Sequence, residues 1–307
     1  MLEKNVLVVG SINVDYVIHT ERLPKLGETL TGSGFSMNFG GKGANQAIAV
    51  AKAGCHVRML GAVGRDHGGD LALQNLETFG VDCSPVLRSD RPTGAAVITV
   101  CGGDNHIILD EGANRTVTPQ CVRDAEELFA WAKFVVLQLE IPVETVCEAA
   151  KLAKKNGASV ILNPAPVKEV PAELFPFVDW VIPNEFEAEI LTGIAQNNDA
   201  DVRAAIDAFR AKGCGNALIT LGKRGCAYLE NGEMRRFGVF SVPVADTTAA
   251  GDSFIGGLCV KLCEGATVGE AVAYATATSA ITVSRRGASA SIPTAEEVRE
   301  FLKAHRI

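Results

Sequence analysis

Short apolar runs alternate along this chain with longer segments in which apolar residues recur every three or four positions. The first pattern is typical of strands covered on both faces, and the second of helices that bury one side. The expected strands are residues 6–10, 57–63, 134–139, 159–162, 180–182 and 217–221. The expected helices are residues 42–53, 70–79, 124–131, 143–155 and 202–212. This alternation predicts an α/β fold with a mainly parallel central sheet and helices on both faces.

Two stretches interrupt the alternation with strand-like sequence. Residues 15–38 are rich in Gly, Thr and Ser. Residues 94–101 and 106–110 flank Gly102-Gly103-Asp104-Asn105, a sequence that favours a hairpin turn. We expect these stretches, about 15–38 and 94–113, to form a small β lid inserted into a single domain that covers residues 1–307.

Composition and charge exclude several classes of function. The chain has 307 residues, a net charge of −7 and nine scattered cysteines. The acidic balance argues against a nucleic-acid-binding protein, which usually carries a basic face. No uncharged apolar stretch of about 18 residues predicts a membrane span. The first apolar run is too short for a signal peptide, so we expect a cytoplasmic protein with reduced thiols and no transition-metal site.

Polar residues follow the predicted strands, at the edge where open α/β sheets bind ligands. The residues concerned are Gly10, Ser11, Asn13 and Asp15 after the first strand, and then Glu140, Asn163, Asn184, Glu187 and Gly222 after later ones. Any one of them could be a helix cap or a turn residue. Their convergence on one edge predicts a binding site there.

The strongest local motif is the run of small residues from Asp246 to Gly257, which enters a predicted helix. Backbone N–H groups at a helix N-terminus attract anions, and the sequence Ala-Ala-Gly before Asp252 lets a phosphate approach the backbone closely. A carboxylate beside such an anion hole can take a proton from an attacking hydroxyl. We therefore expect Asp252 to be a catalytic base for phosphoryl transfer.

A second glycine-rich segment, Phe39-Gly-Gly-Lys-Gly-Ala-Asn-Gln46, lacks the spacing of a Walker A loop. Its three glycines at a helix start suit close approach of the backbone to a small polar ligand, although a tight turn alone would also use them. The segment after residue 10 lacks the GxGxxG spacing of nicotinamide dehydrogenases. Asn184 and Glu187 lie three residues apart at a helix start, where Glu187 could orient a hydrated Mg²⁺ or the pair could cap the helix.

At these residues the sequence resembles the ribokinase-like (PfkB-type) carbohydrate kinases over essentially its whole length. The motifs that carry the resemblance are, in order, Gly10-Ser-Ile-Asn-Val-Asp15, Gly40-Gly-Lys-Gly-Ala-Asn-Gln46, Gly112-Ala-Asn114, Gln138-Leu-Glu140, Asn163-Pro-Ala-Pro166, Pro183-Asn-Glu-Phe-Glu187, Thr220-Leu-Gly222 and Asp246-Thr-Thr-Ala-Ala-Gly-Asp252. The family has a ribokinase-like fold, and its members transfer phosphate from ATP to sugars.

The resemblance implies a role for each of the following residues. The sugar site would comprise Asn13, Asp15, Gly41, Lys42, Gly43, Ala44, Asn45, Glu140 and the base Asp252. The ATP site, with Mg²⁺ near Glu187, would comprise Asn184, Thr220, Leu221, Gly222, Lys223, Arg224, Gly225, Gly251 and Thr276. A K⁺ ion would lie near Asp246, Thr248, Thr282, Arg285, Gly287 and Ser291. The lid would pair with the lid of a second subunit in a homodimer.

The resemblance implies free D-ribose as the sugar, phosphorylated at its primary hydroxyl to ribose 5-phosphate. The motifs around Gly41 and Asn163 carry this preference. The alternative is a kinase of the same family for another pentose, a ketohexose or a nucleoside, although few apolar lid residues could cover a base. A remoter alternative is a sugar-binding sensor without catalysis, against which the intact Asp252 argues.

Overall fold

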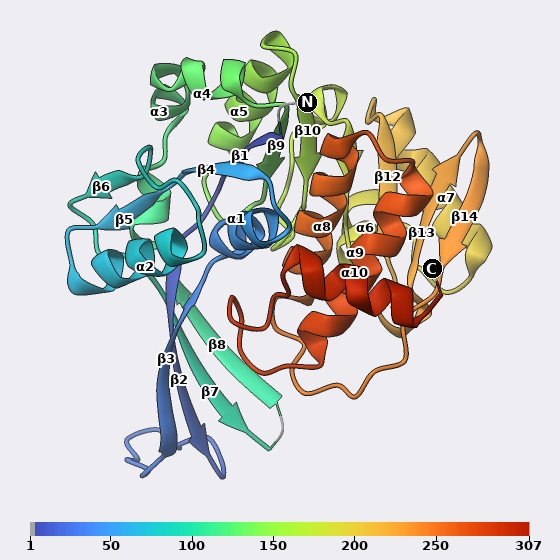
Figure 1. Cartoon of the computed structure of the whole chain (residues 1–307). Helices are drawn as coiled ribbons and strands as arrows, with labels where there is room; N and C mark the ends of the chain where they lie inside the picture. Colours follow the sequence, from blue (N-terminus) through green and yellow to red (C-terminus); the bar gives the residue numbers. More distant parts are fainter. Residues whose placement is uncertain (1–3, 103, 307) are drawn as a thin grey trace.

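The computed structural model describes residues 4–102 and 104–306. A sheet of eight strands forms its middle layer, in the order β14-β13-β12-β11-β10-β9-β1-β4 (Figure 1). Neighbouring strands run parallel from β4 to β12, whereas β13 and β14 are antiparallel. The strands are β1 (Asn5–Val9), β4 (His56–Leu60), β9 (Phe134–Leu137), β10 (Ser159–Leu162), β11 (Trp180–Val181), β12 (Asn216–Thr220), β13 (Cys226–Glu230) and β14 (Glu233–Phe237). The predicted α/β fold with a mainly parallel sheet is confirmed.

Helices cover both faces of the sheet because successive strand residues point to opposite sides. In β1, Val6 and Val8 belong to one buried cluster, and Leu7 and Val9 belong to the other. The first cluster includes residues of α1 (Lys42–Lys52), α2 (His67–Thr78), α8 (Ala250–Glu264), α9 (Val268–Val283) and α10 (Ala295–Ala304). The second includes residues of α3 (Pro119–Asp124), α4 (Glu126–Trp131), α5 (Val143–Lys155), α6 (Glu185–Thr192) and α7 (Asp199–Ala211). None of these helices is long and apolar enough to span a membrane, within the described ranges.

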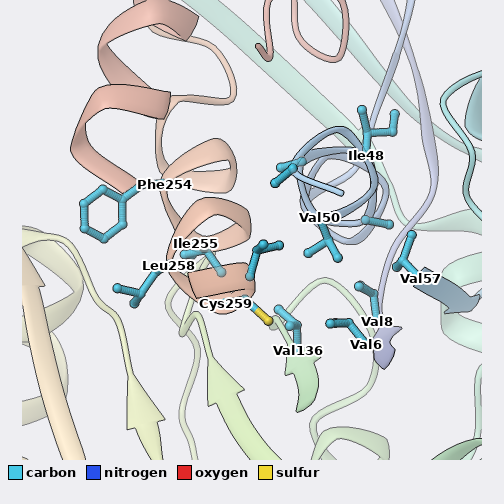
Figure 2. Close-up of a cluster of buried hydrophobic side chains, with 14 of the residues drawn as sticks. Val6, Val8, Ile48, Val50, Val57, Val136, Phe254, Ile255, Leu258 and Cys259 are labelled. Carbon is cyan, nitrogen blue, oxygen red and sulfur yellow. The ribbon is translucent and has the colours of Figure 1, made fainter. Parts of the chain in front are cut away.

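Helix α8 packs closely on its neighbours at two adjacent glycines. A Cβ atom placed on Gly256 would lie 2.3 Å from the Cβ of Ala49 in α1. A Cβ atom on Gly257 would lie 2.9 Å from the hydroxyl of Thr278 in α9. On the same helix, Cys259 points toward Val136 of β9 (Figure 2). The absence of side chains at positions 256 and 257 therefore sets how close α8 lies to α1 and α9.

We predict that Gly256→Ala destabilises the protein by about 1–3 kcal/mol, the usual cost of overfilling a packed interior. The added methyl group would collide with Ala49, which belongs to a rigid helix and has no flexible end to move aside. Urea unfolding would measure the change. Gly238→Ala is the matched control, because a Cβ atom there meets nothing within 4 Å. Equal unfolding midpoints for Gly256→Ala and the control would contradict the prediction.

A second sheet of four strands, in the order β3-β2-β7-β8, extends away from the body of the molecule (Figure 1). Its strands are β2 (Asn13–Thr20), β3 (Ser33–Gly40), β7 (Gly94–Cys101) and β8 (Asp104–Asp110). β2 and β7 pair in parallel, and the outer pairs are antiparallel. These strands lie in the two stretches expected to form the lid. The predicted turn between β7 and β8 includes Gly103, which lies outside the described residues.

One strand predicted from the sequence is wrong. Residues 57–63 form no single strand, because the chain leaves β1 at Gly61 and then pairs β5 (Ala62–Gly64) with β6 (Leu87–Ser89) in a separate sheet. A Cβ atom on Gly61 would lie 2.7 Å from the carbonyl oxygen of Gly10, so the change of partner requires a glycine there. The helix predicted at residues 124–131 is present as α4, which begins at Glu126 because α3 ends at Asp124 and the two helices meet at Ala125, whose φ is −103°.

Other boundaries shift by a few residues for local reasons. β9 ends at Leu137, β11 ends at Val181 and β8 begins at Asp104. α2 begins early because Asp66 caps it through the backbone N–H of Gly69. α7 begins early because Asn198 caps it in the same way. Three short 3₁₀ helices complete the connections: η1 (Gly112–Thr116), η2 (Ala172–Phe177) and η3 (Gly222–Arg224).

Candidate active site

A cavity of about 220 Å³ opens at the carboxyl edge of the central sheet. Residues after β10, β11 and β12 form one side of it, and the N-termini of α1 and α8 form the other. Its lining comprises Lys42, Asn163, Ala165, Ile182, Asn184, Glu187, Thr220, Thr247, Ala249, Ala250, Gly251, Asp252 and Ile255. The polar groups that follow these predicted strands thus meet the small-residue motif of α8 in one cavity.

The N-terminus of α8 lacks a side-chain cap. The residue before the helix, Ala249, adopts a left-handed conformation with φ of 59°. Such a conformation is uncommon for a residue other than glycine and costs of order 1 kcal/mol or more. The turn brings the start of α8 to the cavity, and Gly251 is exposed there. This arrangement fits the anion hole predicted from the sequence.

Asp252 lies in the first turn of α8 and is 7% exposed. Its Oδ2 accepts a hydrogen bond of 3.1 Å from the amide nitrogen of Asn45, and its Oδ1 accepts one of 2.9 Å from the amide nitrogen of Gln46. Both donors come from α1. Each oxygen of the carboxylate is therefore held by an N–H donor.

Lys42 lies in the same cavity among three carboxylates. Burial alone would lower the pKa of Lys42, but the negative charges of Asp252, Glu140 and Glu187 outweigh it and raise the pKa above its usual value. The ammonium group is therefore charged at neutral pH. The sequence placed Lys42 only in the sugar site, and the structure shows that it also lines the cavity at the anion hole.

On the lid side, Asp15 lies on β2 next to the backbone of Gly40 on β3. Burial raises the pKa of Asp15 to about 6, and the nearby charge of Glu140 adds to this effect. The buried side-chain oxygen of Asn13 accepts a 2.7 Å hydrogen bond from Asn114, which also bonds the backbone of Ile12. Asn114 thereby fixes the start of the strand that carries Asp15.

Glu140 joins the segment that follows β1, at Ser11, to the start of α1, at Lys42. Its Oε2 accepts a 2.5 Å hydrogen bond from the hydroxyl of Ser11 and a 2.9 Å bond from the backbone N–H of Lys42. A Cβ atom on Gly43 would lie 2.6 Å from the backbone nitrogen of Ser11, and Gly41 has a φ of 90°. The sequence interpretation expected these glycines to admit a ligand. In the structure, these glycines instead leave space for the backbone around Ser11 to pack against the start of α1.

Asn184 and Glu187 form a reciprocal cap at the start of α6. The backbone and amide nitrogens of Asn184 donate to the two oxygens of Glu187, and the backbone N–H of Glu187 donates to Asn184. This is the capping alternative left open above. Because Glu187 still lines the cavity, the cap does not remove it from contact with a hydrated ion there.

The segment predicted to bind ATP follows β12. Thr220 lines the cavity and pairs with Asn184, which joins the ends of β11 and β12. Arg224 is bound to the carboxylate of Glu185 and donates a 2.7 Å hydrogen bond to the carbonyl oxygen of Gln196, so it supports the loop. Thr276 is buried in α9, where its hydroxyl donates to Val272, and it does not line the cavity.

The residues predicted to lie near K⁺ come from the loop before α8, the last turn of α9 and the loop after α9. Asp246 Oδ1 accepts bonds from Thr248, and its Oδ2 accepts a 3.1 Å bond from the N–H of Gly287. The hydroxyl of Thr282 donates to the carbonyl oxygen of Thr278, and that of Ser291 donates to the carbonyl oxygen of Ala288. Arg285 forms an ion pair with Glu297. Burial would raise the pKa of Asp246, but these hydrogen bonds outweigh it and lower the pKa below its usual value.

A larger cavity of about 970 Å³ lies at the opposite, amino edge of the sheet. Its lining includes His56, Arg58 and Trp131. None of the residues predicted to bind sugar, ATP or metal lines it. Among the described residues, no group of three His, Cys, Asp or Glu side chains could hold a metal ion. The chemistry predicted from the sequence is therefore concentrated at the carboxyl edge.

Sequence reasoning missed Gln46 and Gln138 behind Asp252, and it placed Asn163 at the sheet edge without predicting its contact with them. Gln46, Gln138 and Asn163 are 0%, 0% and 7% exposed, and they are hydrogen-bonded to one another. The available signal was their presence in the motifs that carry the family resemblance. Their contacts join α1 to the ends of β9 and β10, which the sequence pattern does not specify.

Known proteins resemble this chain over nearly its full length. The profile of the pfkB family carbohydrate kinases matches residues 3–295. A ribokinase of Haemophilus influenzae is 40% identical over 98% of this chain and 99% of that protein. A deoxyribokinase of Salmonella typhi is 36% identical over 97% and 98%. The structure of Arabidopsis thaliana ribokinase complexed with ribose and ATP aligns with a TM-score of 0.94 and 34% identity over 98% of this chain and 99% of that one. This chain therefore belongs to the pfkB family of carbohydrate kinases.

Proposed function

We propose that this chain transfers the terminal phosphoryl group of ATP to the primary hydroxyl of free D-ribose, giving ribose 5-phosphate. The observation that carries the proposal is the position of Asp252 in the cavity, beside the uncapped start of α8 and the ammonium group of Lys42. The ribokinase of H. influenzae and the Arabidopsis ribokinase, which was solved with ribose and ATP, support the choice of substrates.

Each of these groups has a role in the transfer. Asp252 takes the proton of the sugar hydroxyl as its oxygen attacks the phosphorus atom. The backbone N–H groups around Gly251 and the charge of Lys42 stabilise the negative charge on the phosphoryl oxygens. Asn13, Asp15, Asn45 and Glu140 bind the ring hydroxyls, with Gly41, Gly43 and Ala44 close to the ring. Asn184 and the loop from Thr220 to Gly225 bind ATP.

The donor set of the cavity fits Mg²⁺. This ion is usually held by one or two carboxylates, water and substrate phosphates, and does not need a cluster of protein ligands. Glu187 lines the same cavity as Asp252, from the separate helix α6, and is the carboxylate that would hold the ion through water. When bound, Mg²⁺ would neutralise charge on the ATP phosphates.

Release of ADP tests this function on a panel of ribose, 2-deoxyribose, ketohexoses, nucleosides and sugar phosphates. We expect ribose to have the highest kcat/KM. A site that hydrogen-bonds a hydroxyl rejects an analogue without it, because its polar groups are left unpaired. The deoxyribokinase relative makes 2-deoxyribose the critical comparison. If another substrate exceeds ribose, the ribose assignment is wrong, and if no sugar stimulates ADP release, the kinase assignment fails.

Potassium is expected to increase turnover severalfold. The carboxylate of Asp246, which accepts a hydrogen bond from the N–H of Gly287, and main-chain oxygens of the same loops would be the ligands of this ion, shortly before the anion hole at Gly251. A bound cation would order that loop. Activity is measured as K⁺ replaces Na⁺ at constant ionic strength, and Asp246→Ala should abolish the response. A wild-type rate independent of the cation would contradict the prediction.

The lid sheets of two chains are expected to pair in a homodimer. Every residue of β8 is exposed, including Ile107 at 57% and Ile108 at 75%, and Phe35 on β3 is 68% exposed. An apolar sheet with open edges is stabilised by a second sheet that covers it. Light scattering at micromolar concentration should give twice the mass of one chain. Ile108→Arg should give monomers, whereas a monomeric wild-type protein would contradict the proposal.

A further inference from the structure

Three buried amide side chains form a continuous chain of hydrogen bonds that ends on Asp252. The amide nitrogen of Asn163 donates to the carbonyl oxygen of Ile182 at 3.1 Å. The amide nitrogen of Gln46 donates to Asn163 Oδ1 at 3.2 Å and to Asp252 Oδ1 at 2.9 Å. The amide nitrogen of Gln138 donates to Gln46 Oε1 at 2.7 Å. The chain thus links the ends of β9, β10 and β11 to α1 and α8.

The orientation of each amide in this chain is determined by its neighbours. A backbone carbonyl only accepts hydrogen bonds, so Asn163 must turn its nitrogen toward Ile182 and its oxygen toward Gln46. Gln46 must then turn its nitrogen toward Asn163 and Asp252. Its oxygen therefore faces Gln138, which donates to it.

We propose that Gln46 and Gln138 are positioning residues for the phosphoryl transfer, which together keep an N–H donor on the buried oxygen of Asp252. Gln46 makes the contact, and Gln138 acts together with Asn163 to keep the nitrogen of Gln46, and not its oxygen, directed at the carboxylate. This inference rests on the proposed role of Asp252 as the base. A carboxylate anchored in this way has one geometry relative to the sugar hydroxyl, and misplacement of a reacting group by about 1 Å can cost ~10²-fold in rate.

The environment of Gln138 supports a role beyond packing. Gln138 is fully buried, and its Oε1 has no hydrogen-bond partner among the described residues. An unpaired buried acceptor costs about 1–3 kcal/mol, so an apolar residue would be the more stable choice for packing alone. A Cβ atom on Gly10 would lie 1.9 Å from this oxygen, so the neighbouring glycine leaves the space that the amide occupies.

The first test is Gln46→Met, which keeps the length of the side chain but removes its N–H donor. We expect kcat to fall by ~10- to 10²-fold, with the KM values for sugar and ATP within ~3-fold of wild type, because the contact acts on the base and not on either substrate. Asn5→Ala is the matched control. It removes another buried amide, at the amino end of β1, and should leave kcat unchanged.

The second test separates orientation from packing and applies even if Gln46→Met fails to fold. In Gln138→Glu, the introduced carboxyl group donates to Gln46 while it is protonated, as the native amide does. Once ionised, this carboxylate only accepts, so it repels the oxygen of Gln46 and competes with Asn163 and Asp252 for the Gln46 nitrogen. The ratio of variant to wild-type kcat should therefore fall as the pH rises. Gln138→Met introduces no ionisable group, and its ratio should not depend on pH.

The outcomes distinguish this inference from the proposed function. If Asp252→Asn is inactive and the Gln138→Glu ratio falls with pH, both stand. If Asp252→Asn is inactive but that ratio is the same at every pH, the positioning role of Gln138 is overturned and the base remains. A Gln46→Met enzyme with wild-type kcat also overturns the inference. Substantial turnover by Asp252→Asn overturns the proposed base, and the inference with it.

Discussion

Asp252→Asn is expected to lower kcat by at least ~10²-fold, the usual scale for loss of a general base. The amide nearly matches the carboxylate in shape but accepts no proton, so the effect should fall on the chemical step. The variant should still bind ATP, because the anion hole at the start of α8 is formed by backbone N–H groups. Steady-state kinetics and calorimetric titration with ATP would measure the two effects separately.

Asp70→Asn is the matched control for this experiment. Asp70 also lies in the first turn of a helix, α2, but it is exposed and pairs with Arg88 away from the cavity. Loss of activity in the control would indicate that removing any carboxylate from the first turn of a helix lowers turnover, and not only the removal of a base. Near wild-type turnover by a folded Asp252→Asn enzyme would refute the assignment of the base.

Asp15→Asn is expected to raise the KM for ribose by ~10- to 10²-fold, the range expected when a charged hydrogen-bond acceptor is lost. The KM for ATP should change little, because Asp15 lies on the lid strand β2 and not in the cavity at α8. In the wild-type enzyme, the KM for ribose should also rise as the pH falls below about 6, where Asp15 becomes protonated. A KM for ribose independent of both changes would exclude Asp15 from the sugar site.

The same substitution should stabilise the protein at neutral pH. The pKa of Asp15 is about 6 in the folded state, above its ordinary value, because burial disfavours the charged form. The protein is therefore more stable at acid pH, where the Asp15 carboxyl group is neutral. This stability is lost as the pH rises through about 6 and the buried group ionises. Asn carries no charge, so the Tm of Asp15→Asn should exceed that of wild type above pH 6, and the difference should vanish as the pH falls toward ~4.

The sequence predicted the parts of the fold that depend on local patterns. The parallel strands are continuous apolar runs such as residues 6–9 in β1, which only a doubly covered sheet can bury. The start of α8 was predicted because small residues and Asp252 follow one another directly. The cap of α6 was left open between two interpretations, because Asn184 and Glu187 suit both a helix cap and a cation site.

The remaining features depend on contacts between distant residues. Gly61 looks like a continuation of a strand until the approach of Gly10 shows that the chain must change partner there. Lys42 acquires its charged environment only when α1 meets Glu140, Glu187 and Asp252. Gln46 and Gln138 are 92 residues apart, and no pattern in either segment specifies their hydrogen bond. Each of these features depends on residues that are far apart in the chain, so no local sequence pattern specifies it.

The left-handed conformation of Ala249 has a consequence for the thermodynamics of nucleotide binding. A loop held in an uncommon conformation before the ligand arrives has already lost its freedom during folding. ATP should therefore bind with a small loss of conformational entropy. Ala249→Gly would relax the backbone in the free enzyme and make this loop flexible. The variant should then bind ATP with a more favourable enthalpy that is offset by a larger loss of entropy. The residue at position 249 would therefore change the heat of ATP binding more than the affinity.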